Sequence, residues 1–231
     1  DCRCNKNNDI CILMTQEAYA DRLIADCNLS DPTVNHPHTP YRSGLPIDSI
    51  PSPDNPPTDQ DSLTKLYQSI VGSLTWLSTS TRPDLATVTN MLAKHSSKPT
   101  KAHLDSARYV VKYVKGTLSH RIAFTHKDSD KLQSFVKFPI PQNVVTALTD
   151  ANWGPQDASI PKLDSPPQHL DLFKSRSVSG YLIWLGGPLH WVSKRQSITA
   201  RLSAEAEIYA LDSTVASARY VNGKEKSLKI K

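Results

Sequence analysis

Two short stretches in the second half of the chain carry carboxylates that could share a metal ion. Asp150 ends a β-branched run, in Leu148-Thr149-Asp150-Ala151-Asn152-Trp153. Glu205 and Glu207 lie in a later stretch with helix-forming composition. Two residues along a helix turn a side chain by about 200°, so only one of these glutamates can face the strand. Hard divalent ions such as Mg²⁺ or Mn²⁺ prefer carboxylate oxygens, so Asp150 and one glutamate form a candidate metal site, although such a pair also arises by chance.

The expected elements around these carboxylates are a strand, a hairpin and a helix. The β-branched residues 144–148 predict the strand that carries Asp150 at its end. Residues 178–185 and 189–193 predict a hairpin around Gly186-Gly187-Pro188. A helix is expected from Ser203, a favourable N-cap residue, to about Tyr220. Residues 154–176 contain prolines without periodicity, which indicates an irregular surface connection.

The first sixty residues predict a small folded start and a spacer. Residues 10–14 form an apolar strand candidate, and Thr15 begins a helix that runs to about Cys27. Residues 32–60 show almost no apolar periodicity and favour an extended, mobile spacer over the surface, with a linear recognition motif as the alternative. Eight prolines lie in this segment: Pro32, Pro37, Pro40, Pro46, Pro51, Pro53, Pro56 and Pro57.

Three helices are predicted next, followed by a short strand and a linker. The second helix begins at Thr81-Arg82-Pro83-Asp84, where proline suits the first turn and aspartate suits the positive end of the helix dipole. The third helix runs from Pro99-Thr100 to Gly116. Residues 121–124 predict a strand, and residues 131–142 a linker. The apolar positions of the first helix are Leu63, Leu66, Tyr67, Ile70, Leu74 and Leu77.

The third helix carries a row of cations opposite its apolar positions: Lys101, Arg108, Lys112 and Lys115. Such a row can track a phosphate backbone, or it can be an ordinary solvated helix face. Lys194 and Arg195, at the end of the hairpin, are further candidates for nucleic-acid contact. Residues 1–60 hold 4 basic and 9 acidic residues, and residues 61–231 hold 23 and 13, giving net charges of −5 and +10. This asymmetry favours a polyanionic partner for the larger part.

The sequence gives little support for a membrane-spanning protein, a cysteine-based zinc site or a serine or cysteine hydrolase. No apolar run approaches the roughly 20 residues of a membrane span, so no membrane partner is expected. The four cysteines all lie within the first 27 residues, and Cys2 and Cys4 are too close for usual zinc spacing. Reduced intracellular thiols are the default expectation. No Ser/His or Cys/His arrangement supports a hydrolase.

Several motifs together resemble the C-terminal part of a copia-type retrotransposon Pol polyprotein, over roughly residues 8–221. The strongest are Tyr67-Gln68-Ser69-Ile70-Val71-Gly72-Ser73-Leu74, then Thr81-Arg82-Pro83-Asp84, then Val114-Lys115-Gly116-Thr117. Three later motifs resemble that family's ribonuclease H segment, in the same order: Asp150-Ala151-Asn152-Trp153, Ser177-Val178-Ser179-Gly180-Tyr181 and Ser203-Ala204-Glu205-Ala206-Glu207.

The resemblance implies an α+β fold with a defined layout. Reverse-transcriptase thumb- or connection-like helices would precede a partial ribonuclease H-like fold of three antiparallel strands and one helix. The implied parts are the end of the palm and its following helix, a proline-rich linker, the helical region, a second linker, the partial ribonuclease H-like domain and a basic tail. They correspond to residues 1–31, 32–60, 61–130, 131–142, 143–222 and 223–231.

The resemblance also implies a chemistry and its partners. The family cleaves the RNA strand of an RNA–DNA hybrid with two divalent ions. Matching motifs assign Asp150 as the strand carboxylate and Glu207 as the helix carboxylate, because Glu207 precedes Ile208-Tyr209-Ala210-Leu211. The implied cofactor is Mg²⁺ or Mn²⁺, held weakly or partially. The implied partners are RNA–DNA hybrid or template–primer duplex and the remainder of the polyprotein, in a cytoplasmic or nuclear setting.

This sequence departs from the family pattern in ways that leave three hypotheses open. No Tyr-x-Asp-Asp polymerase motif occurs in the chain, Asn152 stands where a second aspartate is common, and the family's further nuclease aspartates are expected beyond this point. The first hypothesis is a duplex-binding Pol fragment with an incomplete nuclease centre. The second is an active ribonuclease H, completed by another chain or by Asp157, Asp164 or Asp171. The third is a non-enzymatic nucleic-acid-binding remnant.

Overall fold

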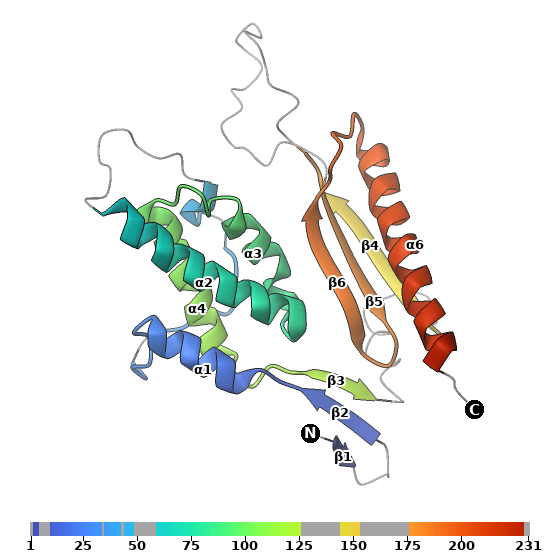
Figure 1. The fold of residues 1–231 in the computed structure, drawn as a ribbon, viewed down its shortest axis with the longest axis horizontal. Helices are drawn as coiled ribbons and strands as arrows, with labels where there is room; N and C mark the ends of the chain where they lie inside the picture. The colour runs from blue at the N-terminus through green and yellow to red at the C-terminus, as the bar shows by residue number, and fades with distance from the viewer. Residues whose placement is uncertain are drawn as a thin grey trace, which may run out of the picture. The chain divides into compact units, whose positions relative to one another are not determined.

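The computed structural model describes residues 2–4, 10–33, 35–42, 44–48, 59–125, 144–152 and 176–228. These residues form mixed helices and antiparallel sheets, which agrees with the predicted α+β class (Figure 1). The chain divides into two compact units. One comprises residues 13–122, and the other comprises residues 2–12 and 123–231. No helix among the described residues is both long and apolar enough to cross a membrane.

The first unit is built from helices, close to the positions expected from the sequence. They are α1 (Glu17–Asp26), α2 (Gln60–Ser80), α3 (Ala86–Ala93) and α4 (Lys101–Gly116), with 3₁₀ turns η1 (Pro46–Asp48) and η2 (Pro83–Leu85). The Asp59 side chain caps α2 by accepting from the Ser62 backbone N–H at 3.0 Å. At the start of α4, Thr100 and His103 form a reciprocal capping box. Local capping therefore explains where α2 and α4 begin.

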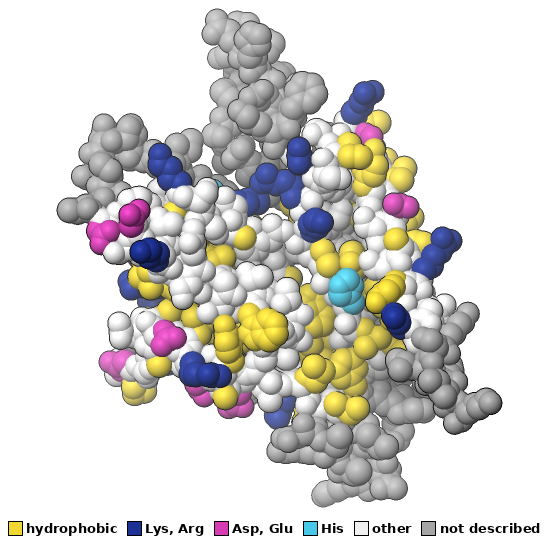
Figure 2. All heavy atoms as spheres, in the orientation of Figure 1, with side chains coloured by type: hydrophobic (Ala, Val, Ile, Leu, Met, Phe, Trp, Pro, Cys, Tyr) yellow, Lys and Arg dark blue, Asp and Glu magenta, His cyan; other side chains and the backbone are white. Residues whose placement is uncertain are grey.

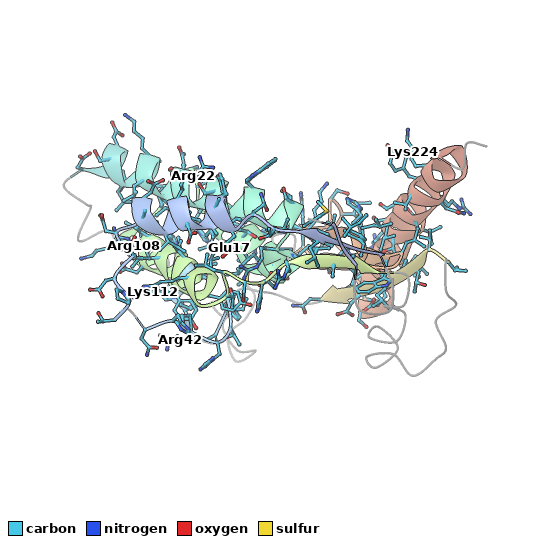
Figure 3. All side chains as sticks on the ribbon, turned by 90° about the horizontal axis from the view of Figure 1, so that it is seen from below. Glu17, Arg22, Arg42, Arg108, Lys112 and Lys224 are labelled. Carbon is cyan, nitrogen blue, oxygen red and sulfur yellow. The ribbon has the colours of Figure 1, made fainter. Side chains whose placement is uncertain are left out.

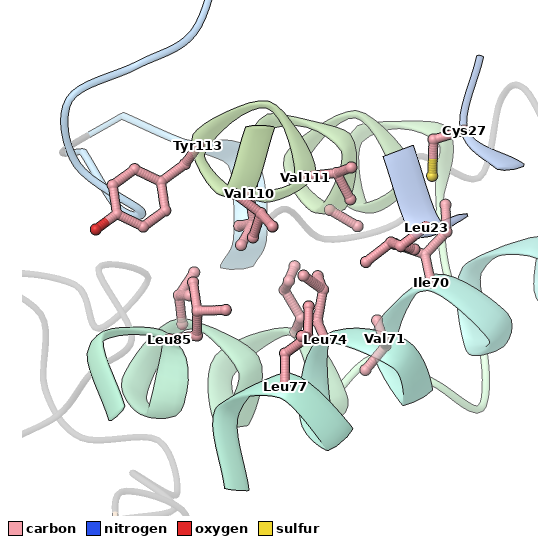
Figure 4. Close-up of a cluster of buried hydrophobic side chains, with 14 of the residues drawn as sticks. Leu23, Cys27, Ile70, Val71, Leu74, Leu77, Leu85, Val110, Val111 and Tyr113 are labelled. Carbon is pink, nitrogen blue, oxygen red and sulfur yellow. The ribbon is translucent and has the colours of Figure 1, made fainter. Parts of the chain in front are cut away.

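The core of this unit lies where α1, α2, α3 and α4 meet, and Figure 4 shows part of it. Leu74, Leu85 and Val110 are completely buried, one from each predicted helical stretch. Tyr67 is also completely buried, and its hydroxyl donates to the Leu92 carbonyl at 2.7 Å. The predicted stripe of α2 is largely confirmed, but its Leu66 is 38% exposed, so the prediction was wrong at that position.

An ion pair between buried Arg82 and partly exposed Asp84 connects the η2 turn before α3 to the end of α4. Arg82, only 4% exposed, lies 2.8 Å from Asp84. The Tyr113 hydroxyl donates to the same carboxylate at 2.9 Å, and Arg82 donates to the Thr117 hydroxyl at 2.6 Å. Burial tends to raise the pKa of Asp84, but the hydrogen bonds and charge of Arg82 and the bond from Tyr113 together lower it. The Thr-Arg-Pro-Asp motif therefore has two roles. It precedes α3, and its Arg82 and Asp84 side chains bind residues at the end of α4.

A small three-stranded sheet combines segments from both ends of the first half of the chain. Its strands are β1 (Cys2–Cys4), β2 (Ile10–Met14) and β3 (Ile122–Thr125), in the order β1-β2-β3. The pairing of β1 with β2 is antiparallel. The strands expected at residues 10–14 and 121–124 are confirmed. The predicted linker at residues 131–142 lies outside the described residues.

The second unit contains the expected hairpin, strand and helix. Strands β4 (Thr146–Asn152), β5 (Val178–Trp184) and β6 (Pro188–Arg195) form an antiparallel sheet in that order. Helix α6 (Ser203–Leu228) packs on β4 and β5 (Figure 1). It begins where the sequence predicted but continues beyond Tyr220 into the segment expected to be a basic tail.

Helix α6 presents small residues to the sheet and larger apolar residues away from it. Ala206, Ala210 and Thr214 are buried and spaced four apart, which lets the helix backbone approach the strands closely. Ile208, Leu211 and Val215 are 64%, 51% and 39% exposed. Figure 2 shows hydrophobic side chains on the surface of this helix. Both sides of α6 therefore have apolar character, but only the side with small residues is covered by described residues.

Candidate functional site

A hydrogen bond between β4 and α6 fixes which side chains of the sheet face the helix. The Thr214 hydroxyl donates to the Thr149 hydroxyl at 2.9 Å. Tyr181, the cross-strand partner of Thr149, also faces α6, because its hydroxyl lies 3.0 Å from the Ser217 hydroxyl. Successive strand residues point to opposite faces of a sheet. Thr149 and Tyr181 therefore define the helix-facing side.

Asp150 projects from the other side of the sheet. It follows Thr149 directly on β4 and pairs with Gly180 of β5, without a register shift between these strands. Its side chain is exposed. The strand was expected over residues 144–148 but runs from Thr146 to Asn152, so Asp150 lies within it, on the face that α6 does not cover.

The two glutamates of α6 have different environments. Glu205 accepts from the Arg201 backbone N–H at 2.6 Å and from the Tyr209 hydroxyl at 3.2 Å. The hydrogen bond and negative charge of Glu205 raise the pKa of Tyr209. Glu207 is exposed and follows Ala206, which is completely buried against the sheet. Glu205 is therefore engaged in local structure at the helix start, and Glu207 is open to solvent.

Asp150 points away from α6, the helix that carries Glu207. Thr214, which touches the residue before Asp150, lies seven residues beyond Glu207, or about 10 Å along the helix axis. Glu207 lies on the flank of α6, and Asp150 lies on the sheet face away from α6. Among the described residues, no group of three or more His, Cys, Asp or Glu side chains could hold a metal ion. The alternative carboxylates Asp157, Asp164 and Asp171 lie outside the described residues, and the metal site at Asp150 and Glu207 stays a prediction.

Gln196 connects the hairpin to the start of α6, a role that sequence reasoning missed. The side chain is 8% exposed, and its Nε2 donates to the Ser179 hydroxyl at 2.9 Å and the Ala206 carbonyl at 2.8 Å. Its backbone N–H donates to the Ser177 carbonyl at 2.8 Å. Gln196 thereby sets the position of the helix turn that carries Glu207. In the sequence, the only indication of this role is that Gln196 is a polar residue directly after a strand.

The cations predicted on the third helix all lie on α4, but not in equal environments. Lys101 is exposed, whereas Arg108, Lys112 and Lys115 are partly buried. The Lys115 ammonium group donates to the Asp31 carbonyl. Burial raises the pKa of the Cys27 thiol, and the nearby positive charge of Arg108 opposes that effect. Lys101 and Lys112 are therefore the side chains of this row with the fewest local interactions.

Lys194 and Arg195 point to opposite faces of β6. Lys194 pairs with Ser179, whose hydroxyl accepts from Gln196 on the helix-facing side. Arg195 is the next residue and pairs with Val178. Strand alternation therefore separates the two side chains, so they cannot act as one cationic pair on a single face.

Several known proteins are similar to this chain in sequence, and Pol polyproteins from transposons are among them. An uncharacterized mitochondrial protein, AtMg00810, of Arabidopsis thaliana is 28% identical over 206 residues, covering 89% of this chain and 70% of that protein. A protein named secreted RxLR effector protein 161 of Plasmopara viticola is 31% identical over 146 residues, covering 63% and 83%. The retrovirus-related Pol polyprotein from transposon RE2 of Arabidopsis thaliana is 27% identical over 216 residues, covering 90% of this chain and 12% of the polyprotein.

Two further comparisons found nothing. No protein-family model matches the chain, and no solved structure matches it. The similarity to RE2 spans both compact units, because it covers 90% of the chain. It concerns only a small part of the polyprotein.

Proposed function

We propose that the chain, which is similar to retrovirus-related Pol polyproteins from transposons, is a segment of the reverse transcriptase and ribonuclease H region that binds nucleic-acid duplex. The substrate class is RNA–DNA hybrid or template–primer duplex. The duplex lies along α4 of the helical unit. The chain itself carries neither DNA synthesis nor, on its own, hybrid cleavage.

The observation that carries this proposal is the cationic side of α4. Lys101, Arg108 and Lys112 follow one side of a capped, well-packed helix, and no ion pair between any of them and a carboxylate occurs among the described residues. A rigid helix with unpaired cations neutralises phosphates at small entropic cost. The positive charge of the chain beyond residue 60 adds a longer-range attraction for a polyanion.

The geometry of the carboxylates favours binding over cleavage. Hybrid cleavage needs metal ions clamped between converging carboxylates. Strand alternation directs Asp150 away from α6, the helix that carries Glu207, and this supports a chain that does not hold one ion between them. In this proposal, Asp150 and Glu207 are residues retained from a ribonuclease H metal centre, and that centre is incomplete in this chain.

Duplex binding is tested by fluorescence anisotropy on a labelled RNA–DNA hybrid between about 50 and 200 mM salt. We expect affinity to fall steeply with salt, and the double variant Lys101→Gln/Lys112→Gln to lower the log–log salt slope by about 1.8, because each phosphate that is no longer neutralised accounts for about 0.9. Lys65→Gln is the matched control, because Lys65 is an exposed cation on α2 of the same unit. Binding that does not respond to salt, or an equal effect of the control, would refute the role of α4.

Cleavage is tested separately with the RNA strand labelled and Mg²⁺ or Mn²⁺ added. The expected result is no cleavage above background. Metal-dependent cleavage that Asp150→Asn abolishes would overturn the incomplete-centre proposal and establish an active ribonuclease H. Duplex binding and cleavage are thus judged by independent readouts.

A further inference from the structure

The proline-rich segment before α2 lies across α4. We call it the strap and define it as described residues 31–33, 35–42 and 44–48. At its start, the Asp31 carbonyl accepts from Lys115. A Cβ added to Gly116 would lie 2.4 Å from His36 Nδ1, so the strap touches the end of the helix. Near its other end, Ile47 is completely buried. The strap is therefore a packed part of the helical unit.

The strap places Arg42 against the charged side of α4. The guanidinium carbon of Arg42 lies 5.3 Å from the ring centroid of Tyr109. Tyr109 lies three residues before Lys112, and Arg108 lies four residues before it, so Lys112 is within one helical turn of both (Figure 3). An arginine stacked on an aromatic ring is restrained, while its N–H edge stays available to an anion.

The surface formed by Arg42, Arg108 and Lys112 is positive. No ion pair joins any of these three cations to a carboxylate among the described residues, so none is neutralised directly there. Asp105, an exposed residue of α4, lies on the same side and carries the opposing charge. The Asp26 carboxylate of α1 acts on Cys27 together with Arg108, so it is a second opposing charge. Two carboxylates against these cations and Lys101 leave a net positive surface. Sequence spacing along α4 cannot reveal Arg42, because it comes from a segment about sixty-five residues earlier.

We propose that Arg42 is a phosphate-binding residue, and that the strap and α4 together recognise the sugar–phosphate backbone of nucleic acid rather than its bases. This inference rests on the proposed duplex binding. Arg108 and Lys112 are separated by about 6 Å along the helix axis, close to two steps of about 3.4 Å on one strand of a duplex. The planar fork of Arg42 suits two parallel hydrogen bonds to phosphate oxygens.

The test compares Arg42→Gln with Arg22→Gln in the full chain by anisotropy with a labelled RNA–DNA hybrid. Arg22 is the matched control because its guanidinium also lies over a tyrosine, 5.9 Å from the ring of Tyr19, but on the exposed side of α1. In Figure 3 it lies on the other side of the unit from Arg42. We expect Arg42→Gln to lower the salt slope by about 0.9 and Arg22→Gln to leave it unchanged. Arg42→Lys keeps the charge and is expected to retain most of the slope.

The outcomes separate this inference from the proposed function. If the wild-type chain binds with a steep salt dependence but Arg42→Gln behaves like Arg22→Gln, the role of Arg42 is refuted and duplex binding stands. If the wild-type chain shows no salt-dependent binding, both fall. Backbone recognition also requires the loss of affinity to be equal on two hybrids of different sequence, so a sequence-dependent loss would overturn it. Thermal unfolding of each variant shows whether the fold is intact, and Arg42→Lys supplies the comparison if Arg42→Gln is destabilised.

Discussion

The Thr214 hydroxyl lies 2.9 Å from the Thr149 hydroxyl, and this contact decides on which face of the sheet Asp150 appears. Residues at even and odd positions of β4 cannot both face α6. Because Thr149 faces the helix, Asp150 faces away from it. The sheet therefore lies between the Asp150 side chain and helix α6. The chemistry open to the second unit therefore depends on this pair of threonines.

Replacing either threonine by valine should destabilise the second unit, whereas replacing both should cost little more. Thr214→Val leaves the Thr149 hydroxyl without its partner on α6, at a cost of about 1 kcal/mol, while two valines of similar shape leave no polar group unsatisfied between them. A double-mutant cycle by urea unfolding measures the coupling. Additive costs would show that the two hydroxyls do not interact in solution.

Asp84→Asn should destabilise the helical unit by about 2–3 kcal/mol at neutral pH, because it leaves the buried Arg82 without its charge partner. The pKa of Asp84 is lowered in the folded chain, so the carboxylate stabilises the fold above its unfolded pKa of about 3.9. That contribution is lost as pH falls through the lower, folded pKa.

Urea unfolding of the wild type and of Asp84→Asn at neutral pH and at about pH 3, below the unfolded pKa of an aspartate, checks both parts. We expect the difference between the two proteins to shrink at the lower pH. A difference that stays constant between the two pH values would contradict the assignment of the charge to Asp84.

Glu205→Gln and Glu207→Gln should have unequal effects on stability. Glu205 accepts two hydrogen bonds at the start of α6, so its neutralisation should cost about 1 kcal/mol. Glu207 is exposed, and its change should stay within about 0.5 kcal/mol. Thermal unfolding compares the two variants, and amide exchange at Arg201 reports the capping bond directly. Equal destabilisation would mean that Glu207 has a structural partner in solution.

Ile47→Ala should destabilise the helical unit by about 2–4 kcal/mol, since the side chain is completely buried. Tyr41→Ala is the control within the strap, because Tyr41 is 44% exposed, and its expected cost is below about 0.5 kcal/mol. Urea unfolding at neutral pH distinguishes them. A negligible effect of Ile47→Ala would show that the strap is detached from the core in solution.

Much of the fold could be predicted because local signals and packing agree. The start of α4 was expected at Pro99-Thr100, and α6 begins at Ser203, where the sequence placed its start. The strands of the second unit follow β-branched runs and a glycine turn. The apolar spacing of α2 identified Leu74 and Leu77 correctly. These features depend on neighbours a few residues away, which a single sequence displays directly.

The features that sequence reasoning missed depend on contacts between distant residues. The composition of residues 32–60 predicted a spacer, yet Ile47 enters the core, because one apolar residue carries no periodicity. The motif match distinguished Glu207 from Glu205, but the hydrogen bonds of Glu205 to Arg201 and Tyr209 could not be predicted. The sequence located the strand that carries Asp150. It could not predict on which face of the sheet the Asp150 side chain lies, because that depends on the face against which α6 packs.

The burial of Ile47 also bears on the order in which the chain can fold during its synthesis. The strap packs on α4, which is made about fifty to seventy residues later. At about 5–20 residues per second, a ribosome needs several seconds to complete α4 after Ile47 has emerged. During that interval the strap has no surface to pack against, and α2 has only part of its core. The helical unit can therefore fold cooperatively only after α4 has been synthesised, when the strap and α4, which are far apart in sequence, come into contact.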